Sequence, residues 1–184
     1  MDSALIYQAA NEIVQSTGTR NIKLIARSCS LDISETHRIK DVLGMLSLCF
    51  EKPMVLINSH LDKQTKQMVC GYALGHYLEH QLLMDLHTLK KFLTIMDQHI
   101  FLYEQNVFTS HLMLDSDEVY QMTRHGLDAA QIAAAKRIHL NLVMVKLLEL
   151  HHLGYDLRHY HAQHHAFIKK FNLPAHFQFD VAAG

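Results

Sequence analysis

Histidine is the residue type that stands out in this chain, with 16 among 184 residues. His76 and His80 are four positions apart in the segment GYALGHYLEH. Positions four apart lie on the same face of a helix, so both imidazoles can reach one ion. Two histidines at this spacing are typical of a helix that chelates zinc. With Glu79 they form the pattern His-x-x-Glu-His, in which the carboxylate can act as a general base.

The segments around this pair resemble the ImmA/IrrE family of zinc metallopeptidases. The stretch MVLINSHLDKQTKQMVCGYALGHYLEH resembles that family's strand and the helix that carries its motif AHELGH. Further on, EQNVFTSHLML resembles the segment whose glutamate, here Glu104, is the family's third zinc ligand. IAAAKRIHLNLVMVKLLELHHLGYDL resembles the closing helices. The three segments occur in the family's order, and the resemblance covers about residues 5–157.

The chain departs from the family at the catalytic positions. Tyr72 and Ala73 stand where the family has its first histidine and its glutamate, whereas His76 occupies the second-histidine position. A catalytic zinc site needs three protein ligands and an open position for water, and a neutral phenol is a poor ligand. The missing glutamate would take a proton from metal-bound water, a role worth about 10²- to 10⁴-fold in rate. We therefore expect the inherited site to be inactive and to hold no cofactor.

Three other arrangements of the same residues stay open. Zinc could bind to His76, His80 and Glu104 without catalysis, or the same ligands could act with Glu79 as the base of an inverted motif. The inverted site would lie about one helical turn, ~5.4 Å, from where the family's third ligand expects it. Alternatively, Tyr72, His76 and Glu104 form a hydrogen-bonded polar cluster that fills the vacated site, because buried polar groups need partners.

Hydrophobic periodicity and capping signals predict the elements that must position these residues. We expect helices at 3–16, 22–28, 63–86, 88–98, 100–113, 116–124, 129–137, 140–153 and 156–171. We expect strands at 31–37, 45–52 and 53–59. The last two strands are predicted to join tightly at Lys52-Pro53 in a small antiparallel sheet. Asp62, Asp115 and Asp128 are the predicted N-caps.

These elements predict a single domain of the α+β class over residues 1–184, predominantly helical, with a C-terminal helical part over about 128–184. A chain of 184 residues is long enough for one well-buried core and short for two domains. Only two prolines and seven glycines interrupt it, which favours long helices. The family resemblance further implies a zincin-like metallopeptidase domain.

Composition argues against several classes of function. The formal net charge of -1 provides no strong basic surface for nucleic acid. The N-terminal segment MDSALIYQAANEIV lacks the pattern of a secretory signal, and no apolar run approaches the ~20 residues that span a bilayer. Cys29, Cys49 and Cys70 are odd in number and form no CxxC pair, which is typical of reduced thiols. We expect a cytoplasmic protein with no membrane partner.

Two further features admit a functional interpretation. His161, His164 and His165 lie close together on the last predicted helix and could form a peripheral metal site, or a solvated face that gains charge below neutral pH. The helices at 129–137 and 140–153 have the spacing of a helix-turn-helix. The second of them, NLVMVKLLELHHLG, carries one lysine and many apolar residues. Core packing or a partner surface explains that composition better than DNA reading does.

Members of the ImmA/IrrE family commonly act on helix-turn-helix repressors, so the resemblance implies a regulatory role in a bacterial or prophage setting. The leading hypothesis is a pseudopeptidase that binds a repressor or another regulatory protein without cutting it. Such binding can shift a switch by favouring one state of the partner. The rival hypotheses are an active zinc peptidase that uses His76, Glu79, His80 and Glu104, and a DNA-binding regulator.

Overall fold

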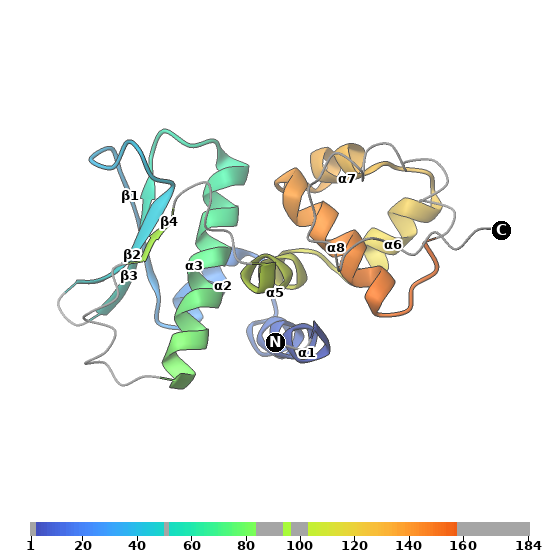
Figure 1. The fold of residues 1–184 in the computed structure, drawn as a ribbon, viewed down its shortest axis with the longest axis horizontal. Coiled ribbons are helices and arrows are strands. Elements are labelled where there is room, and N and C mark those ends of the chain that lie inside the picture. Colours follow the sequence, from blue (N-terminus) through green and yellow to red (C-terminus); the bar gives the residue numbers. More distant parts are fainter. Residues whose placement is uncertain (1–2, 50–51, 84–93, 97–102, 158–184) are drawn as a thin grey trace.

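A computed structural model describes residues 3–49, 52–83, 94–96 and 103–157. Figure 1 shows a small sheet on one side of the molecule, α3 running along it, α5 and α1 in the middle, and α6–α8 on the other side. The strands are β1 (Asp32–Thr36), β2 (Gly44–Cys49), β3 (Lys52–Asn58) and β4 (Thr94–Met96). The helices are α1 (Ser3–Thr17), α2 (Ile22–Ser28), α3 (Lys63–Leu83), α5 (Tyr103–Met113), α6 (Ser116–Arg124), α7 (Ala129–Lys136) and α8 (Leu140–His152). The predicted α+β class with a predominance of helix is confirmed.

The sheet is mixed, so the prediction of a purely antiparallel sheet is wrong. Its strand order is β1-β3-β2-β4. β2 pairs antiparallel with β3 and with β4, whereas β1 pairs parallel with β3. The parallel pair arises because β3 inserts between β1 and β2 and runs in the direction of β1. Cys49 pairs with Lys52, so Lys52 and Pro53 belong to β3, and the predicted junction between them is also wrong.

A strand replaces part of the helix that was predicted at 88–98. Residues 94–96 form β4, which pairs with β2 so that Ile95 lies opposite Met45. The β-branched residues Thr94 and Ile95 favour a strand, and the open edge of β2 offers unpaired backbone groups. The rest of that predicted helix lies outside the described residues. So does most of the helix predicted at 156–171, whose first residues, Asp156 and Leu157, are not helical.

Aspartate side chains begin three of the helices, as predicted. Asp62 accepts hydrogen bonds from the backbone N–H groups at positions 64 and 65, over 2.9 and 3.0 Å. Asp115 accepts one from the backbone of Glu118 over 3.0 Å. Asp128 and Gln131 form a reciprocal capping box at the start of α7. These caps satisfy N–H groups that lack a partner within the helix, which is why the sequence marks these boundaries well.

One continuous apolar core joins the sheet to the helices on its inner side. Val55 and Ile57 alternate along β3 and are fully buried, as expected for residues on one face of a strand. The same core includes Leu74 of α3, Leu112 of α5 and Leu142 of α8. α5 therefore lies between two parts of the fold, with α3 on one side and α8 on the other (Figure 1). Among the described residues, no helix combines the length and the apolar character that a membrane span requires.

Candidate functional site

Two glycines set the distance between α3 and α5. A Cβ atom on Gly71 would come within 2.3 Å of Thr109 Cγ2, and one on Gly75 would come within 3.0 Å of Phe108 Cδ1. The two glycines are four positions apart and so share a face of α3. α5 approaches α3 closely along that face because no side chain separates the helices. We term this contact, made by Gly71, Gly75, Gln105, Phe108 and Thr109, the α3–α5 seam.

The residues that stand in place of the family's first zinc ligand and catalytic base are core residues. Tyr72 is 2% exposed and Ala73 is 0% exposed. The ring of Tyr72 stacks on that of His76, with centroids 6.5 Å apart and planes inclined by 20°. A phenol of this size fills interior space beside the seam, and protein interiors are close-packed. The methyl group of Ala73 has no polar atom with which to carry a proton.

The other predicted ligands are described only in part. His76 and Glu104 are partly exposed. His76 directly follows the seam residue Gly75, and Glu104 directly precedes the seam residue Gln105. Both have interactions with other residues. The side chains of Glu79 and His80 lie outside the described residues. Within the described part of the chain, no three His, Cys, Asp or Glu side chains gather into a metal-binding group.

The two metal-site alternatives therefore stay predictions, since both need His80. The polar-cluster alternative stays a prediction too, because the contact between Tyr72 and His76 is a stack of their rings. The participation of Glu104 in that cluster stays a prediction. The cluster at His161, His164 and His165 lies outside the described residues.

On its opposite side, α5 contributes to a group of buried ionisable residues that were not anticipated from the sequence. His111 and Glu149 are 0% exposed, and Lys146 is 1% exposed. Lys146 Nζ lies 2.8 Å from His111 Nδ1 and 2.9 Å from Ser116 Oγ. The hydroxyl of Tyr103 donates a hydrogen bond to Glu149 Oε1. We term these five residues the buried polar cluster.

The contacts of the cluster form a chain. Ser116 of α6 contacts Lys146 of α8, which contacts His111 of α5, and His111 in turn faces Glu149 of α8. His111 Nε2 lies 3.8 Å from Glu149 Oε2, which is longer than a hydrogen bond but close enough for a strong electrostatic interaction in a buried site. On the outer side of α8, His152 Nδ1 lies 3.1 Å from Glu149 Oε1. Buried charges persist when they are paired in this way. The cluster therefore ties α8 to α5.

Burial and mutual contacts shift the ionisation of these groups. Burial alone would raise the pKa of Glu149, but polar contacts with His111, Tyr103, Ser3 and His152 lower that pKa to about 2. The cluster thus holds a stable carboxylate.

The two bases respond in the opposite sense to burial. Burial is the main reason that the pKa of Lys146 falls to about 7, and the positive charge of Arg20 lowers it further. Burial likewise lowers the pKa of His111. The cluster therefore favours a neutral imidazole, because desolvation penalises the charged form of a base.

The contact between Ser116 and Lys146 has the composition of a nucleophile and its base, yet the burial of both argues against catalysis. Ser116 is 7% exposed and Lys146 is 1% exposed, so a substrate has no access to the hydroxyl. A structural role fits better. The sequence does hold a signal for the cluster, since Lys146 and Glu149 interrupt the otherwise apolar run LVMVKLLEL, and buried charges require partners.

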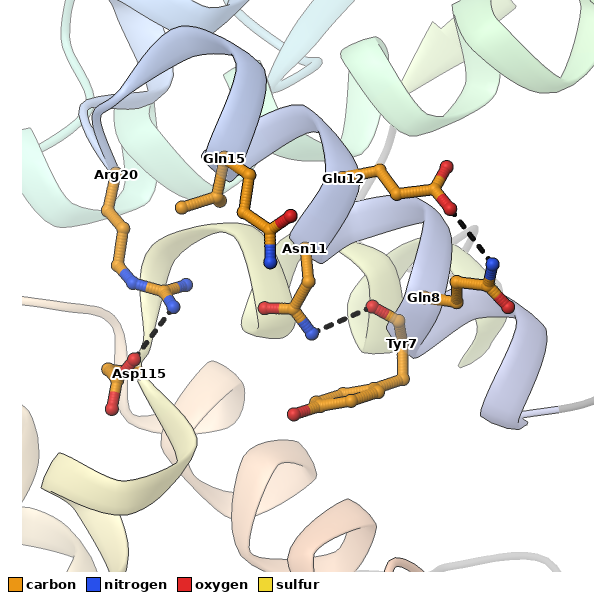
Figure 2. Close-up of a pocket in the computed structure, with 8 residues that line it drawn as sticks. Tyr7, Gln8, Asn11, Glu12, Gln15, Arg20 and Asp115 are labelled. Atoms are coloured by element: carbon orange, nitrogen blue, oxygen red, sulfur yellow. Dashed lines mark hydrogen bonds and ion pairs between the residues drawn. The ribbon is translucent and has the colours of Figure 1, made fainter.

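A polar pocket of about 500 Å³ lies beside α1. Figure 2 shows Arg20 reaching Asp115, and Asn11 donating to the carbonyl of Tyr7. The distance from Arg20 Nη2 to Asp115 Oδ2 is 2.8 Å, and Arg20 Nη1 donates to the carbonyl of His111 over 2.7 Å. Arg20 thereby satisfies the C-terminal end of α5. The pocket is lined by Tyr7, Gln8, Asn11, Glu12, Val14, Gln15, Arg20 and Asp115.

α7 and α8 are joined by three residues, as in a helix-turn-helix. The first of these, Arg137, has a left-handed backbone with φ of 52°, which lets the chain turn sharply after α7. Much of α8 is core, in agreement with the prediction from its composition. Its buried residues are Leu142, Val143, Lys146, Leu147, Leu148, Glu149 and Leu150.

The cysteines were predicted to be reduced thiols, and the structure describes the side chains of two of them. Cys29 and Cys70 are free. Cys70 is fully buried, and burial raises its pKa to about 12. Its thiol is therefore held in the protonated form, as expected for a packed side chain.

Comparison of the chain with protein-family models, curated proteins and solved structures found no match. The likeness to the ImmA/IrrE family thus consists of the three sequence segments and their order.

Proposed function

We propose that this chain is a catalytically inactive, metallopeptidase-like regulatory protein that binds a protein partner beside the α3–α5 seam. One observation carries the proposal: Tyr72 and Ala73 are packed into the core at the positions where catalysis would need an imidazole and a carboxylate. Hydrolysis by the inherited route would lack both a ligand for the metal and a base for the water.

The surroundings of the seam support binding. His76, Glu104, Asn106 and Phe108 are partly exposed, and they combine a titratable group, a carboxylate, an amide and an aromatic ring. Aromatic side chains ringed by polar groups are frequent at the centres of protein interfaces. The family resemblance suggests that the partner is a helix-turn-helix repressor in a bacterial or prophage cytoplasm. Binding that favours one state of the repressor is sufficient for regulation.

The test uses purified helix-turn-helix repressors from the same genome, with binding measured by calorimetry and cleavage by mass spectrometry, with and without added zinc. We expect one repressor to bind and none to be cut. Glu104→Lys should weaken binding by about tenfold or more, because it reverses a charge beside the seam. The matched control is Asp41→Lys, which reverses the charge of an exposed residue before β2 and should leave the affinity unchanged.

Two outcomes would contradict the proposal. One is equal loss of affinity in Glu104→Lys and Asp41→Lys, which would place the interface elsewhere. The other is cleavage of a repressor that a chelator stops and Glu79→Gln abolishes. That result would establish the active alternative, with His76, His80 and Glu104 as zinc ligands.

A further inference from the structure

The buried polar cluster points to a device that does not depend on the proposed partner. We propose that the cluster is a pH-sensitive latch between α5 and α8. Uptake of a second proton by His111 in mildly acidic solution releases α8 from α5, while the sheet and α3 stay folded.

Once Lys146 is protonated, its hydrogen-bond chemistry fixes the state of His111 in the closed latch. An ammonium group has three donors and no acceptor. The 2.8 Å contact with Lys146 Nζ therefore requires His111 Nδ1 to accept, which leaves the ring proton on Nε2. That N–H faces Glu149 Oε2 at 3.8 Å. Below about pH 7, where Lys146 carries its proton, the closed state holds one buried cation and one buried carboxylate, joined by a neutral imidazole.

A second proton on His111 breaks this balance. Both ring nitrogens then become donors, and the imidazolium and the ammonium group of Lys146 meet in a site that excludes water. Arg20 adds a third positive charge, because its Nη1 lies 2.7 Å from the backbone carbonyl of His111. Uncompensated charges are costly in a buried site. Opening the α5–α8 contact to water relieves that cost.

The two aspartates near the latch have partners outside the pair formed by His111 and Lys146. The carboxylate of Asp115 binds Arg20 over 2.8 Å, and Asp117 accepts a hydrogen bond from the Tyr155 hydroxyl over 2.8 Å. Toward His111 and Lys146, α1 presents the ring of Tyr7, which meets the His111 ring edge-on with centroids 5.0 Å apart. The polar and charged groups that face the cluster are Ser3 and Tyr7 from α1, Arg20, Tyr103 from α5, Asp115 at the N-cap of α6, Ser116 and Asp117 from α6, and Lys146, Glu149 and His152 from α8.

The release should be confined to one side of α5. The α3–α5 seam consists of Gly71 and Gly75 against Gln105, Phe108 and Thr109, none of which titrates. Protonation therefore weakens the contact with α8 and leaves the contact with α3 unchanged. Figure 1 shows that α6–α8 lie together on the far side of α5 from the sheet, so α8 can move away from α5 without moving the sheet or α3.

Hydrogen exchange of the full chain, read by mass spectrometry from about pH 8 to about pH 5, tests the latch. After correction for the intrinsic pH dependence of exchange, opening of α8 should increase by about tenfold per pH unit once His111 begins to charge. The protection of α3 and β3 should stay constant. His111→Gln keeps an acceptor for Lys146 but cannot titrate, so it should remove the acid response.

His139 supplies the matched control, because it is a second histidine that acid could act through. It forms the N-cap of α8, and its ring accepts from the backbone of Asn141. His139→Asn keeps a capping group without a titrating ring, and the acid response should survive it. In Lys146→Met the second cation is absent, so opening of α8 should shift to lower pH. This variant tests the latch if His111→Gln does not fold.

The inference is overturned if α3 and α8 lose protection together as the pH falls. It is equally overturned if the response of α8 persists in His111→Gln, disappears in His139→Asn, or stays at the same pH in Lys146→Met.

Discussion

α5 has two sides, and the contrast between them is the main lesson of this fold. Toward α3, spacing and motif predict metal chemistry, yet Tyr72 and Ala73 are packed as core residues. Toward α8, no motif predicts chemistry, yet His111, Lys146 and Glu149 are buried together with shifted pKa values. A motif locates residues on a helix, whereas burial and partners decide what those residues can do.

The largest effect expected from this comparison is on the α8 side. Glu149→Gln removes the only carboxylate in the cluster, which faces His111 and accepts from the Tyr103 hydroxyl. Loss of one partner from a buried pair should reduce the free energy of unfolding by about 3–5 kcal/mol, as measured by urea denaturation. Glu118→Gln is the control. Its carboxylate is 51% exposed and binds Lys136, and an exposed pair of this kind contributes about 0–1 kcal/mol. Similar losses of unfolding free energy in both variants would show that the buried carboxylate contributes no more to stability than an exposed one.

The cluster also predicts how stability depends on pH. The pKa of Lys146 is lowered from 10.5 to about 7 in the folded chain, so between these values the unfolded chain binds a proton that the folded chain does not. The free energy of unfolding should therefore fall as pH decreases through this window, with a slope of up to about 1.4 kcal/mol per pH unit. Lys146→Met should flatten the slope in thermal denaturation series. An unchanged slope would mean that other groups cause it.

The seam side should respond to volume instead of charge. In Gly71→Ala the new methyl group meets Thr109 Cγ2, and overpacking of this kind costs about 1–3 kcal/mol. The higher helix propensity of alanine offsets up to about 1 kcal/mol of this loss of stability. Thr109→Ser removes that methyl group and keeps the hydroxyl bond to the carbonyl of Gln105. The double variant should recover part of the lost stability, since the hydroxyl oxygen still lies 3.0 Å from the new methyl group. Failure of this rescue in chemical denaturation would show that the close approach is not limiting.

The elements that could be predicted are those with local signals. Asp62, Asp115 and Asp128 mark the starts of helices because an N-cap acts within three residues of itself. The parallel pairing of β1 with β3 could not be predicted, because it depends on which strand inserts between the others. β4 was missed because three residues carry too little periodicity to outweigh a helical pattern.

The candidate site shows the same division between local and tertiary information. The positions of Tyr72, His76 and Glu104 followed from sequence alone. The closeness of α3 to α5 did not, because the role of Gly71 and Gly75 becomes visible only when Phe108 and Thr109 lie opposite. The charged residues Lys146 and Glu149 stand within an apolar helix, and this pattern indicates that they are buried with partners. Their partners His111 and Tyr103 come from another helix, which no local pattern specifies.

A zinc titration of the purified chain, followed by calorimetry and elemental analysis, tests the central claim that the inherited metal site is lost. We expect wild type to retain no stoichiometric zinc, and we expect Tyr72→His to raise zinc affinity by more than about tenfold, because it restores the third ligand beside His76 and Glu104. The control is the same substitution combined with His76→Gln, which should bind no better than wild type. One tightly held zinc per wild-type chain, together with peptide hydrolysis that a chelator stops, would contradict the claim.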